Sequence, residues 1–519
     1  MTETTPQQKE IDPVIMRRVL VKGTFVLKSV AHFGGGNSEV ADMTLTRGAD
    51  GSLLIPGSSI AGACRSYLAY RLLGKEAFDY VDGIKVLAER DDQILREYEL
   101  KRREHKVNIS WLFGTGLDEK LSDTENDYLL RREGWQSALL FSDAYVLEES
   151  GPPEIRDGVR IDAKTGQVFI DQKKGAKYDL ETVPAGTTFE ICLELVIRKY
   201  VAERNLRELL NLILEGFKQG EILLGARTRR GLGWGEVADW LVQDFDFSLA
   251  GHLQNWLYRK DTWVAWTSWA KGLGKLPTIK ASYCNFTINF KIEDSLLIRR
   301  YSDKDGEPDA VMRKSGNDWV IPATSAAGVL RHRAARILRT LAGAGQDDKV
   351  DKKLAALFGM VETKQDKKEQ RAGRLIVQES TLDGVDAEVH TRVRIDRFTG
   401  GALSNYLFEE MPVWGSSAKP GSWTLRFRIL EPAEWEIALL LHLVKDLWMG
   451  DLTIGGEGGI GRGKMRGKQA EICWRKADGE LLKWEFEEAA GKLSLNQEQA
   501  QTLNEYAAKL AELEVAHGS

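Results

Sequence analysis

The feature that most limits how this chain can fold is an internal duplication. Five landmarks recur in the same order in its two halves. They are an extended apolar segment, an Ile-Pro-x-[Ser/Thr]-Ser loop before a helix-like run, a Leu-Phe-Gly, an Arg-Ile-Asp-x-x-Thr-Gly turn and a glycine-rich loop. Ordered self-similarity of this kind is typical of a repeated structural unit. The sequence therefore predicts two similar domains in one polypeptide.

The spacing of the landmarks shows where the two halves differ. In the first half they lie at 19–30, 55–62, 111–114, 159–166 and 224–235, and in the second at 286–292, 321–328, 356–359, 393–400 and 454–463. The separation between partners shrinks along the chain, which indicates loop insertions between shared elements. We expect a charged insertion at about 76–106 and a lysine-rich one at about 346–371.

Strand-like and helix-like segments alternate within each half, which favours an α+β fold. We expect strands at 137–146, 187–197, 374–379 and 422–430, and helices at 63–73, 206–217, 329–341 and 434–446. The predicted units are a first domain at 14–243, a joint at 244–282, a second domain at 283–468 and a cap at 469–519 with a helix near 496–516. Four joint tryptophans, Trp256, Trp263, Trp266 and Trp269, are expected to pack between the halves.

Composition narrows the class of protein. The 519 residues include 72 Lys and Arg against 77 Asp and Glu, a net charge of −5, and 43% are hydrophobic, as in ordinary globular proteins. The four cysteines, Cys64, Cys192, Cys284 and Cys473, lie far apart without a Cys-x-x-Cys pair, which disfavours a disulfide framework or a thiolate zinc site. No long apolar run and no signal-like start are present, so we expect a cytoplasmic protein without a membrane partner.

The glycine-rich loops are candidate phosphate-binding segments. Arg227, Arg229 and Arg230 stand among alternating glycines, and Arg462 and Lys464 stand beside glycines in the second half. Glycine lets backbone N–H groups approach a phosphate closely, and arginine adds bidentate donors. A twisted hairpin with solvated charges is the alternative interpretation.

The Ile-Pro-x-[Ser/Thr]-Ser loops are the second candidate. Ser58 and Ser59, with Thr324 and Ser325 in the other half, precede helix-like runs, where an N-terminus favours an anion. Basic side chains follow one to two turns later, at Arg65 and at Arg331. Plain helix capping would explain the hydroxyl groups without any ligand.

Taken together, these motifs resemble the RAMP superfamily of CRISPR-associated proteins. The likeness covers roughly 19–240 and 283–468, and it is nearer to the backbone subunits of type III effector complexes, with two fused copies resembling the double-backbone subunit of a type III-D variant. The resemblance implies tandem ferredoxin-like domains, each a modified RNA-recognition fold with a β-hairpin called a thumb. The thumbs would lie at 154–184 and 392–412 and include Arg160 and Arg394.

The same resemblance implies partners and site residues. Guide RNA, target RNA and other effector-complex subunits would be the partners. In the family an aspartate upstream of the Ile-Pro loop cleaves target RNA, and Asp42 matches it in a loop opened by His32 and Gly35. Asp309 takes the corresponding place in the second half, although the opening His-x-Gly-Gly-Gly is absent there and Asp303 and Asp305 compete with it.

A lone carboxylate is sufficient for this chemistry because RNA carries its own nucleophile, the 2′-OH. A hydrated Mg²⁺ or another divalent cation held by Asp42 or Asp309 would neutralise charge developing on the phosphate. The sequence leaves two other functions open. One is a scaffold that binds guide RNA without cutting, and the other is a guide-processing endonuclease, which would usually need a catalytic histidine, for which the repeats show no matched pair.

Overall fold

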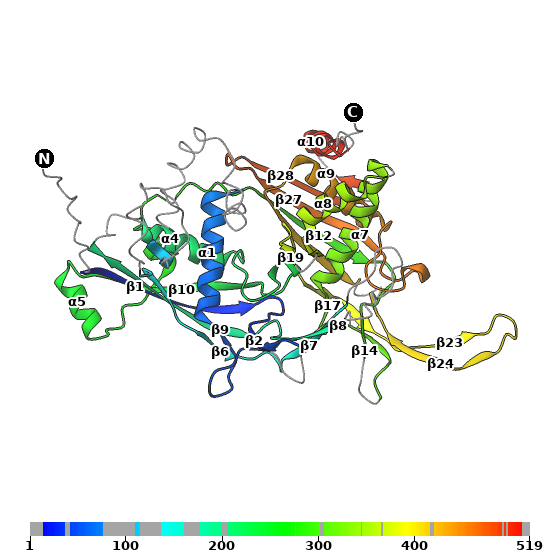
Figure 1. Cartoon of the computed structure of the whole chain (residues 1–519), viewed down its shortest axis with the longest axis horizontal. Coiled ribbons are helices and arrows are strands. Elements are labelled where there is room, and N and C mark those ends of the chain that lie inside the picture. The colour runs from blue at the N-terminus through cyan, green and yellow to red at the C-terminus, as the bar shows by residue number, and fades with distance from the viewer. Residues whose placement is uncertain are drawn as a thin grey trace.

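The computed structural model contains two β-sheets of the same design, each covered by helices (Figure 1). It describes residues 14–36, 42–75, 109, 111–114, 136–159, 177–199, 205–275, 277–301, 306–343, 345–364, 367–415, 420–489, 492–494 and 497–510. The charged insertion expected at 76–106, together with Arg160, Asp303 and Asp305, lies outside these residues.

The first sheet is built around the long strand β1 (Ile15–Leu27), which pairs antiparallel with a strand on either side. Alternate side chains of β1, including Val19, Val21, Phe25 and Leu27, enter the core, as period-two patterning requires. In spatial order the strands are β11 (Val264–Ala265), β10 (Gly235–Asp246), β1, β9 (Thr188–Arg198), β6 (Ala144–Glu148) and β4 (Leu54–Ile55), and β5 (Leu139–Phe141) also pairs with β9.

The second sheet repeats this plan around β12 (Tyr283–Ile292). Its strands in order are β16 (Lys314–Ser315), β17 (Asp318–Ile321), β21 (Ser380–Asp383), β26 (Ser422–Leu430), β12, β27 (Met465–Arg475), β28 (Leu481–Ala489) and β29 (Lys492–Ser494), and β20 (Leu375–Val377) also pairs with β26. The central order β27-β12-β26-β20 matches β10-β1-β9-β5, which is the ferredoxin-like arrangement. The predicted α+β duplication is therefore confirmed.

Two helices in each domain fill the crossovers between these strands. They are α1 (Gly57–Leu73) and α4 (Leu206–Lys218) in the first domain, and α7 (Ala323–Ala342) and α9 (Glu434–Met449) in the second. The helices α1 and α7 begin six residues before the predicted starts, because Pro56 and Pro322 take the N-cap position and the hydroxyl residues join the first turn. None of the helices in the described ranges is long and apolar enough to span a membrane.

A β-hairpin leaves each sheet where a thumb is expected. The first thumb hairpin consists of β7 (Glu154–Val159) and β8 (Lys177–Thr182), and the second of β23 (His390–Ile395) and β24 (Ala402–Met411). Figure 1 shows the second projecting away from the body of the molecule. At its tip, backbone N–H groups of Thr399 and Phe398 lower the pKa of Asp396, and the Phe398 side chain is 98% exposed.

Short elements complete the two domains. In the first domain these are β2 (Gly34–Gly36) and β3 (Thr44–Leu45). In the second they are β13 (Ser295–Leu296), β14 (Arg299–Tyr301), β15 (Ala310–Met312), β22 (Val385–Ala387) and β25 (Val413–Gly415). The lysine-rich insertion forms α8 (Asp347–Phe358), β18 (Met360–Lys364) and β19 (Lys367–Arg371).

The tryptophan-rich joint packs on the first domain and not between the halves, which corrects the sequence prediction. Trp266 donates to Asn211 of α4 at 2.7 Å, and Trp269 donates to Asp244 of β10 at 2.9 Å. The joint forms β11, α5 (Ala250–Leu257) and α6 (Trp266–Ala270), because β11 extends the first sheet beside β10.

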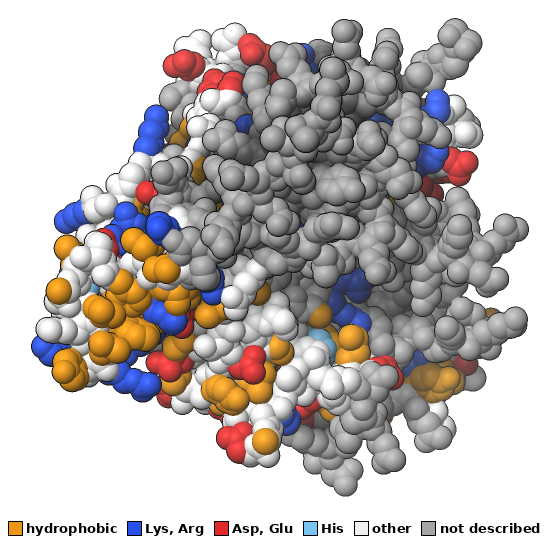
Figure 2. Space-filling view, turned by 60° about the vertical axis from the view of Figure 1, so that its left-hand side comes forward, with side chains coloured by type: hydrophobic (Ala, Val, Ile, Leu, Met, Phe, Trp, Pro, Cys, Tyr) orange, Lys and Arg blue, Asp and Glu red, His pale blue; other side chains and the backbone are white. Residues whose placement is uncertain are grey.

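This joint also carries exposed apolar side chains on the outer end of the first domain. Leu253, Leu257 and Tyr258 are among them. Figure 2 shows apolar side chains gathered there beside Lys and Arg.

The C-terminal segment is part of the second domain, because β27 runs through the boundary predicted at residue 468 and β28 pairs with it. The helix α10 (Gln497–Ala508) packs on this sheet, where Tyr506 meets the rings of Trp474 and Trp484 edge to face. Leu510 is buried and Leu503 packs against the core, as predicted, whereas Leu513 lies outside the described residues.

The two domains meet through the first glycine-rich loop. A Cβ at Gly231 would lie 2.1 Å from the Ala323 Cβ of α7 and 2.5 Å from the Val377 carbonyl oxygen of β20. The first thumb hairpin also contacts the second domain, because its Arg156 pairs with Glu379 at 2.7 Å.

We expect Gly231→Ala to lower the thermal unfolding midpoint more than Gly461→Ala does. Both glycines have positive φ, 83° and 94°, so both substitutions carry the left-handed backbone cost of roughly 1–2 kcal/mol. Only Gly231 adds overpacking against the second domain, typically about 1–3 kcal/mol, because nothing lies within 4 Å of a Cβ at Gly461. Differential scanning calorimetry compares the two variants, and equal midpoints would contradict the tight contact.

Candidate functional site

Asp42 and Asp309 occupy the same place in the two domains. The Asp42 Oδ2 accepts a hydrogen bond from the backbone N–H of Asp179 at 3.0 Å, and the Asp309 Oδ2 accepts one from Glu409 at 2.9 Å. Asp179 and Glu409 both lie on the return strand of a thumb hairpin. Both aspartates are exposed, so each carboxylate is held by a thumb and reachable from solvent.

The strand geometry after each aspartate supports this equivalence. Met43 forms a parallel bridge with Leu180, and Ala310 pairs in parallel with Glu410. Parallel contacts are otherwise absent from the strand pairs that the structure describes. Asp309 therefore has the same position relative to its thumb hairpin as Asp42 has in the first domain.

The glycine-rich loops share one backbone. In the first, Gly233 donates to the Val30 carbonyl at 2.8 Å and accepts from Leu224, and in the second Gly463 donates to Ser295 at 2.7 Å and accepts from Ile454. Each loop contains one 3₁₀ turn, η4 (Thr228–Arg230) or η5 (Gly458–Ile460), preceded by a residue in the left-handed conformation.

Their side chains differ at the residue that enters each turn. The first loop has Arg227 there, and its guanidinium contacts the Met43 sulfur at 3.4 Å, next to Asp42. The second has Glu457. The first loop thus has a cation at this position, next to the segment of Asp42. The second loop has a carboxylate at the equivalent position.

Arg229 and Arg230 follow Arg227 within η4, the 3₁₀ turn of the first glycine-rich loop. Arg230 is exposed, whereas burial lowers the pKa of the Arg229 guanidinium. The Nη1 of Arg229 is buried and has no hydrogen-bond partner. The first loop therefore presents three cations where the domains meet.

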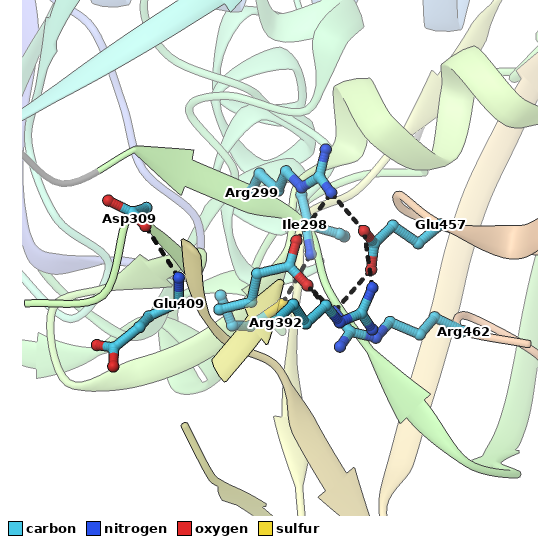
Figure 3. Close-up of polar contacts among 9 residues, drawn as sticks. Ile298, Arg299, Asp309, Arg392, Glu409, Glu457 and Arg462 are labelled. Carbon is cyan, nitrogen blue, oxygen red and sulfur yellow. Dashed lines mark hydrogen bonds and ion pairs between the residues drawn. The ribbon is translucent and has the colours of Figure 1, made fainter. Parts of the chain in front are cut away.

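The second loop is neutralised by a buried network, which sequence reasoning missed (Figure 3). Arg462 is 3% exposed and its guanidinium lies 3.0 Å from Glu410 and 2.8 Å from Glu457. Arg299 and Arg392 contact the same two carboxylates. Arg462, expected to bind RNA, instead ties the loop to the base of the second thumb hairpin.

Lys464 remains on the surface but is also paired. Its Nζ lies 3.5 Å from Glu293, which Arg466 contacts at 3.0 Å. Two cations share one carboxylate there, so the local excess is a single positive charge.

The hydroxyl residues at the helix starts do not act as caps. Neither Pro56 nor Pro322 has a side-chain capping bond, and Ser58, Ser59, Thr324 and Ser325 lie inside the first turns. Ser58, Ser59 and Thr324 are exposed, and Ser325 is half-buried. The capping explanation for these hydroxyl groups is therefore wrong.

The remaining predicted residues have diverse environments. His32 is fully buried, and its Nδ1 lies 2.7 Å from the Glu181 carbonyl oxygen at the base of the first thumb hairpin. Gly35 is needed for a close approach, since a Cβ would lie 2.5 Å from the Leu45 oxygen. Arg65 is exposed, Arg331 donates to the Gly359 carbonyl at 2.8 Å, and Arg394 lies over the Tyr406 ring at 5.3 Å.

A preformed metal cage is absent from the described residues, which contain no group of three His, Cys, Asp or Glu placed to hold an ion. Mg²⁺ commonly uses one or two carboxylates and completes its shell with water and substrate phosphates. The exposed carboxylates of Asp42 and Asp309 fit that second mode.

Comparison with known families agrees with this architecture. The family model described as the RAMP superfamily matches residues 24–236 and 289–468. The chain belongs to the RAMP superfamily, with one matched region in each domain. This membership suggests a subunit of a CRISPR-associated complex. A search of curated proteins finds no match.

We expect Glu410→Ala to destabilise the second domain strongly. Its carboxylate is 2% exposed and serves three arginines, and removing one side of a buried ion pair typically costs about 3–5 kcal/mol. Glu409→Ala is the matched control because its side chain is exposed and, among the described residues, accepts a hydrogen bond from Thr391 in place of an arginine network. Chemical denaturation followed by tryptophan fluorescence measures both, and similar losses would show that the network contributes little.

Proposed function

We propose that this protein is a subunit of a type III CRISPR RNA-guided effector complex that binds guide RNA and cleaves complementary target RNA at two sites. The sites are Asp42 in the first domain and Asp309 in the second. The observation that carries the proposal is the matched placement of these two carboxylates, each exposed and held by a thumb backbone N–H, in a chain whose two halves both match the RAMP family.

The cleavage needs few protein groups because the attacking oxygen belongs to the RNA. The 2′-oxygen attacks the adjacent phosphorus in line and the bond to the 5′-oxygen breaks, which leaves a 2′,3′-cyclic phosphate. The departing 5′-oxygen takes a proton from water and becomes a 5′-hydroxyl. Splaying one nucleotide against a thumb hairpin would supply the in-line geometry, which accounts for much of the rate. The carboxylate of Asp42 or Asp309 would accept the proton or position the water that accepts it.

A divalent cation such as Mg²⁺ would neutralise the charge that develops on the phosphate. Asp42 and Asp309 would each hold it with one carboxylate. In the first domain Arg227 adds a second positive group, whose guanidinium contacts Met43, the residue after Asp42. The first site is thus the better equipped for phosphate chemistry.

Guide RNA would bind along the first glycine-rich loop and the helix start that faces it. Arg227, Arg229 and Arg230 supply cations there, and the Thr324 hydroxyl lies exposed at the start of α7. These contacts are to phosphates, so binding would not depend on base sequence. The second loop, neutralised by Glu410 and Glu457, would contribute less.

Asp42→Asn and Asp309→Asn should each abolish one cut in the assembled complex and leave the other. Asparagine keeps an oxygen that can accept the thumb N–H but loses the charge, and loss of acid–base catalysis typically costs about 10²–10⁴-fold in rate. Mapping of cleavage positions on end-labelled target RNA measures this. Asp50→Asn, an exposed aspartate that bonds to Ser52, is the control. Unchanged cutting by the double variant would make the protein a non-catalytic scaffold.

Replacing Arg227 and Arg230 by alanine should weaken guide retention more than replacing Lys464 and Arg466. Lys464 and Arg466 share the carboxylate of Glu293, whereas Arg227 and Arg230 stand in the segment 225–235, which contains no acidic residue. Each lost phosphate contact should flatten the plot of log affinity against log salt by about 0.7 for single-stranded RNA. Filter binding across a salt series compares the variants. Equal losses would contradict assignment of the main phosphate contacts to the first loop.

A further inference from the structure

The thumb hairpin of the first domain is fastened to the second domain by a buried ion pair. Arg156 of β7 donates to both carboxylate oxygens of Glu379, at 2.7 and 3.3 Å, and the two side chains are only 12% and 5% exposed. Beside them the Glu154 carboxylate accepts a hydrogen bond from the backbone N–H of Gly316, in the turn between β16 and β17. Figure 1 shows β7 and β8 beside β17 there. The second domain thus holds this hairpin at two points.

Strand register connects the ion pair to the first candidate aspartate. Arg156 faces Leu180 in the ladder of β7 and β8, and Leu180 forms the parallel bridge to Met43, the residue after Asp42. The residue before Leu180, Asp179, donates the backbone N–H that holds the Asp42 carboxylate. The anchored side chain therefore stands opposite the stretch of β8 that orients Asp42.

The second domain holds its own aspartate in a different way. Asp309 accepts from Glu409, and the residue that faces the next position of that strand is His390, which therefore takes the place of Arg156. The His390 ring packs on Trp414 of β25 with centroids 4.5 Å apart. The buried arginine–glutamate network at this thumb belongs to the second domain as well. The thumb of the second site is held by its own domain, whereas the thumb of the first site is also held by the other.

We propose that the second domain positions the first candidate cleavage site, with Arg156 and Glu379 as positioning residues for Asp42. They act through β8, because fixing Arg156 fixes the strand whose N–H orients the carboxylate. A displacement of about 1 Å can cost about 10²-fold in rate, so this restraint matters for in-line attack. The inference rests on the proposed function, and it adds that the first cut depends on a contact between the domains.

The buried surroundings of the pair allow folding and positioning to be separated. Arg313 of the second domain is 9% exposed, and burial lowers the pKa of its guanidinium to about 10, an effect that Arg156 increases and Glu379 opposes. Loss of Glu379 alone would therefore leave buried cations without their carboxylate. Replacing both members of a buried pair by apolar side chains of similar volume is often neutral for stability, since one charge of each sign is removed.

Two variants of the full chain in the assembled complex test the proposal, Glu379→Gln and the double variant Arg156→Met with Glu379→Met. In both, the cut that depends on Asp42 should slow by about 10²-fold, and the cut that depends on Asp309 should keep its rate. The double variant should also keep the thermal midpoint of the wild type. The matched control is Arg333→Met with Asp446→Leu, which removes a 2.6 Å ion pair between α7 and α9 and should leave the ratio of the two cuts unchanged.

Hydrogen exchange of the purified chain without RNA supplies a measurement that does not depend on cleavage. Amides of β8, residues 177–182, should exchange faster in both test variants than in wild type, because their strand has lost its anchor. Amides of β24, residues 402–411, should exchange at the wild-type rate and are the internal reference.

Faster exchange in β8 together with selective slowing of the first cut supports the proposal. Unchanged exchange in β8, equal slowing of both cuts, or an unchanged first cut despite faster exchange would overturn it. Either variant is sufficient if the other does not fold. Wild type without any aspartate-dependent cut would refute the proposed function, and the exchange comparison would then decide by itself whether the second domain holds the strand that orients Asp42.

Discussion

The architecture depends on one close backbone contact of a glycine, which occurs once in each domain. Gly233 and Gly463 lie so close to the carbonyl oxygens of Leu224 and Ile454 that a Cβ would come within 1.8 and 1.9 Å of them. Only glycine fits, and its positive φ turns the loop back toward the segment that leaves the first strand of each domain. This contact places the glycine-rich loop beside the end of the first strand, after which the loop with the candidate aspartate begins.

On this common backbone the two domains carry different electrostatics. Arg227 enters the first loop, and Glu457 enters the second at the equivalent position. The first loop faces the second domain and includes a buried Arg229 nitrogen without a hydrogen-bond partner, whereas Arg462, Glu410 and Glu457 lock the second loop to its thumb hairpin. Duplication thus preserved the geometry while each domain acquired its own charge pattern.

Much of the fold could be predicted from sequence because its determinants are local. The strand at 422–430 and the helix start at Glu434 agree with the structure residue by residue, since apolar periodicity and turn residues define them. The equivalence of Asp42 and Asp309 was also accessible, because their spacing to the Ile-Pro loop is nearly the same. The tryptophans of the joint were misplaced, because spacing indicates that a side chain is buried but not against which domain.

The sequence by itself determined the duplication, the α+β class and the positions of two loop aspartates, because repetition and periodicity are properties of residue order. Only the tertiary structure decided which of the charged side chains are ion-paired. Arg462 and Arg229 look alike in the chain, yet the first is neutralised by Glu410 and Glu457, and the second keeps a buried nitrogen without a partner. The reason is that an ion pair is set by distances between strands far apart in sequence, which residue order does not encode locally.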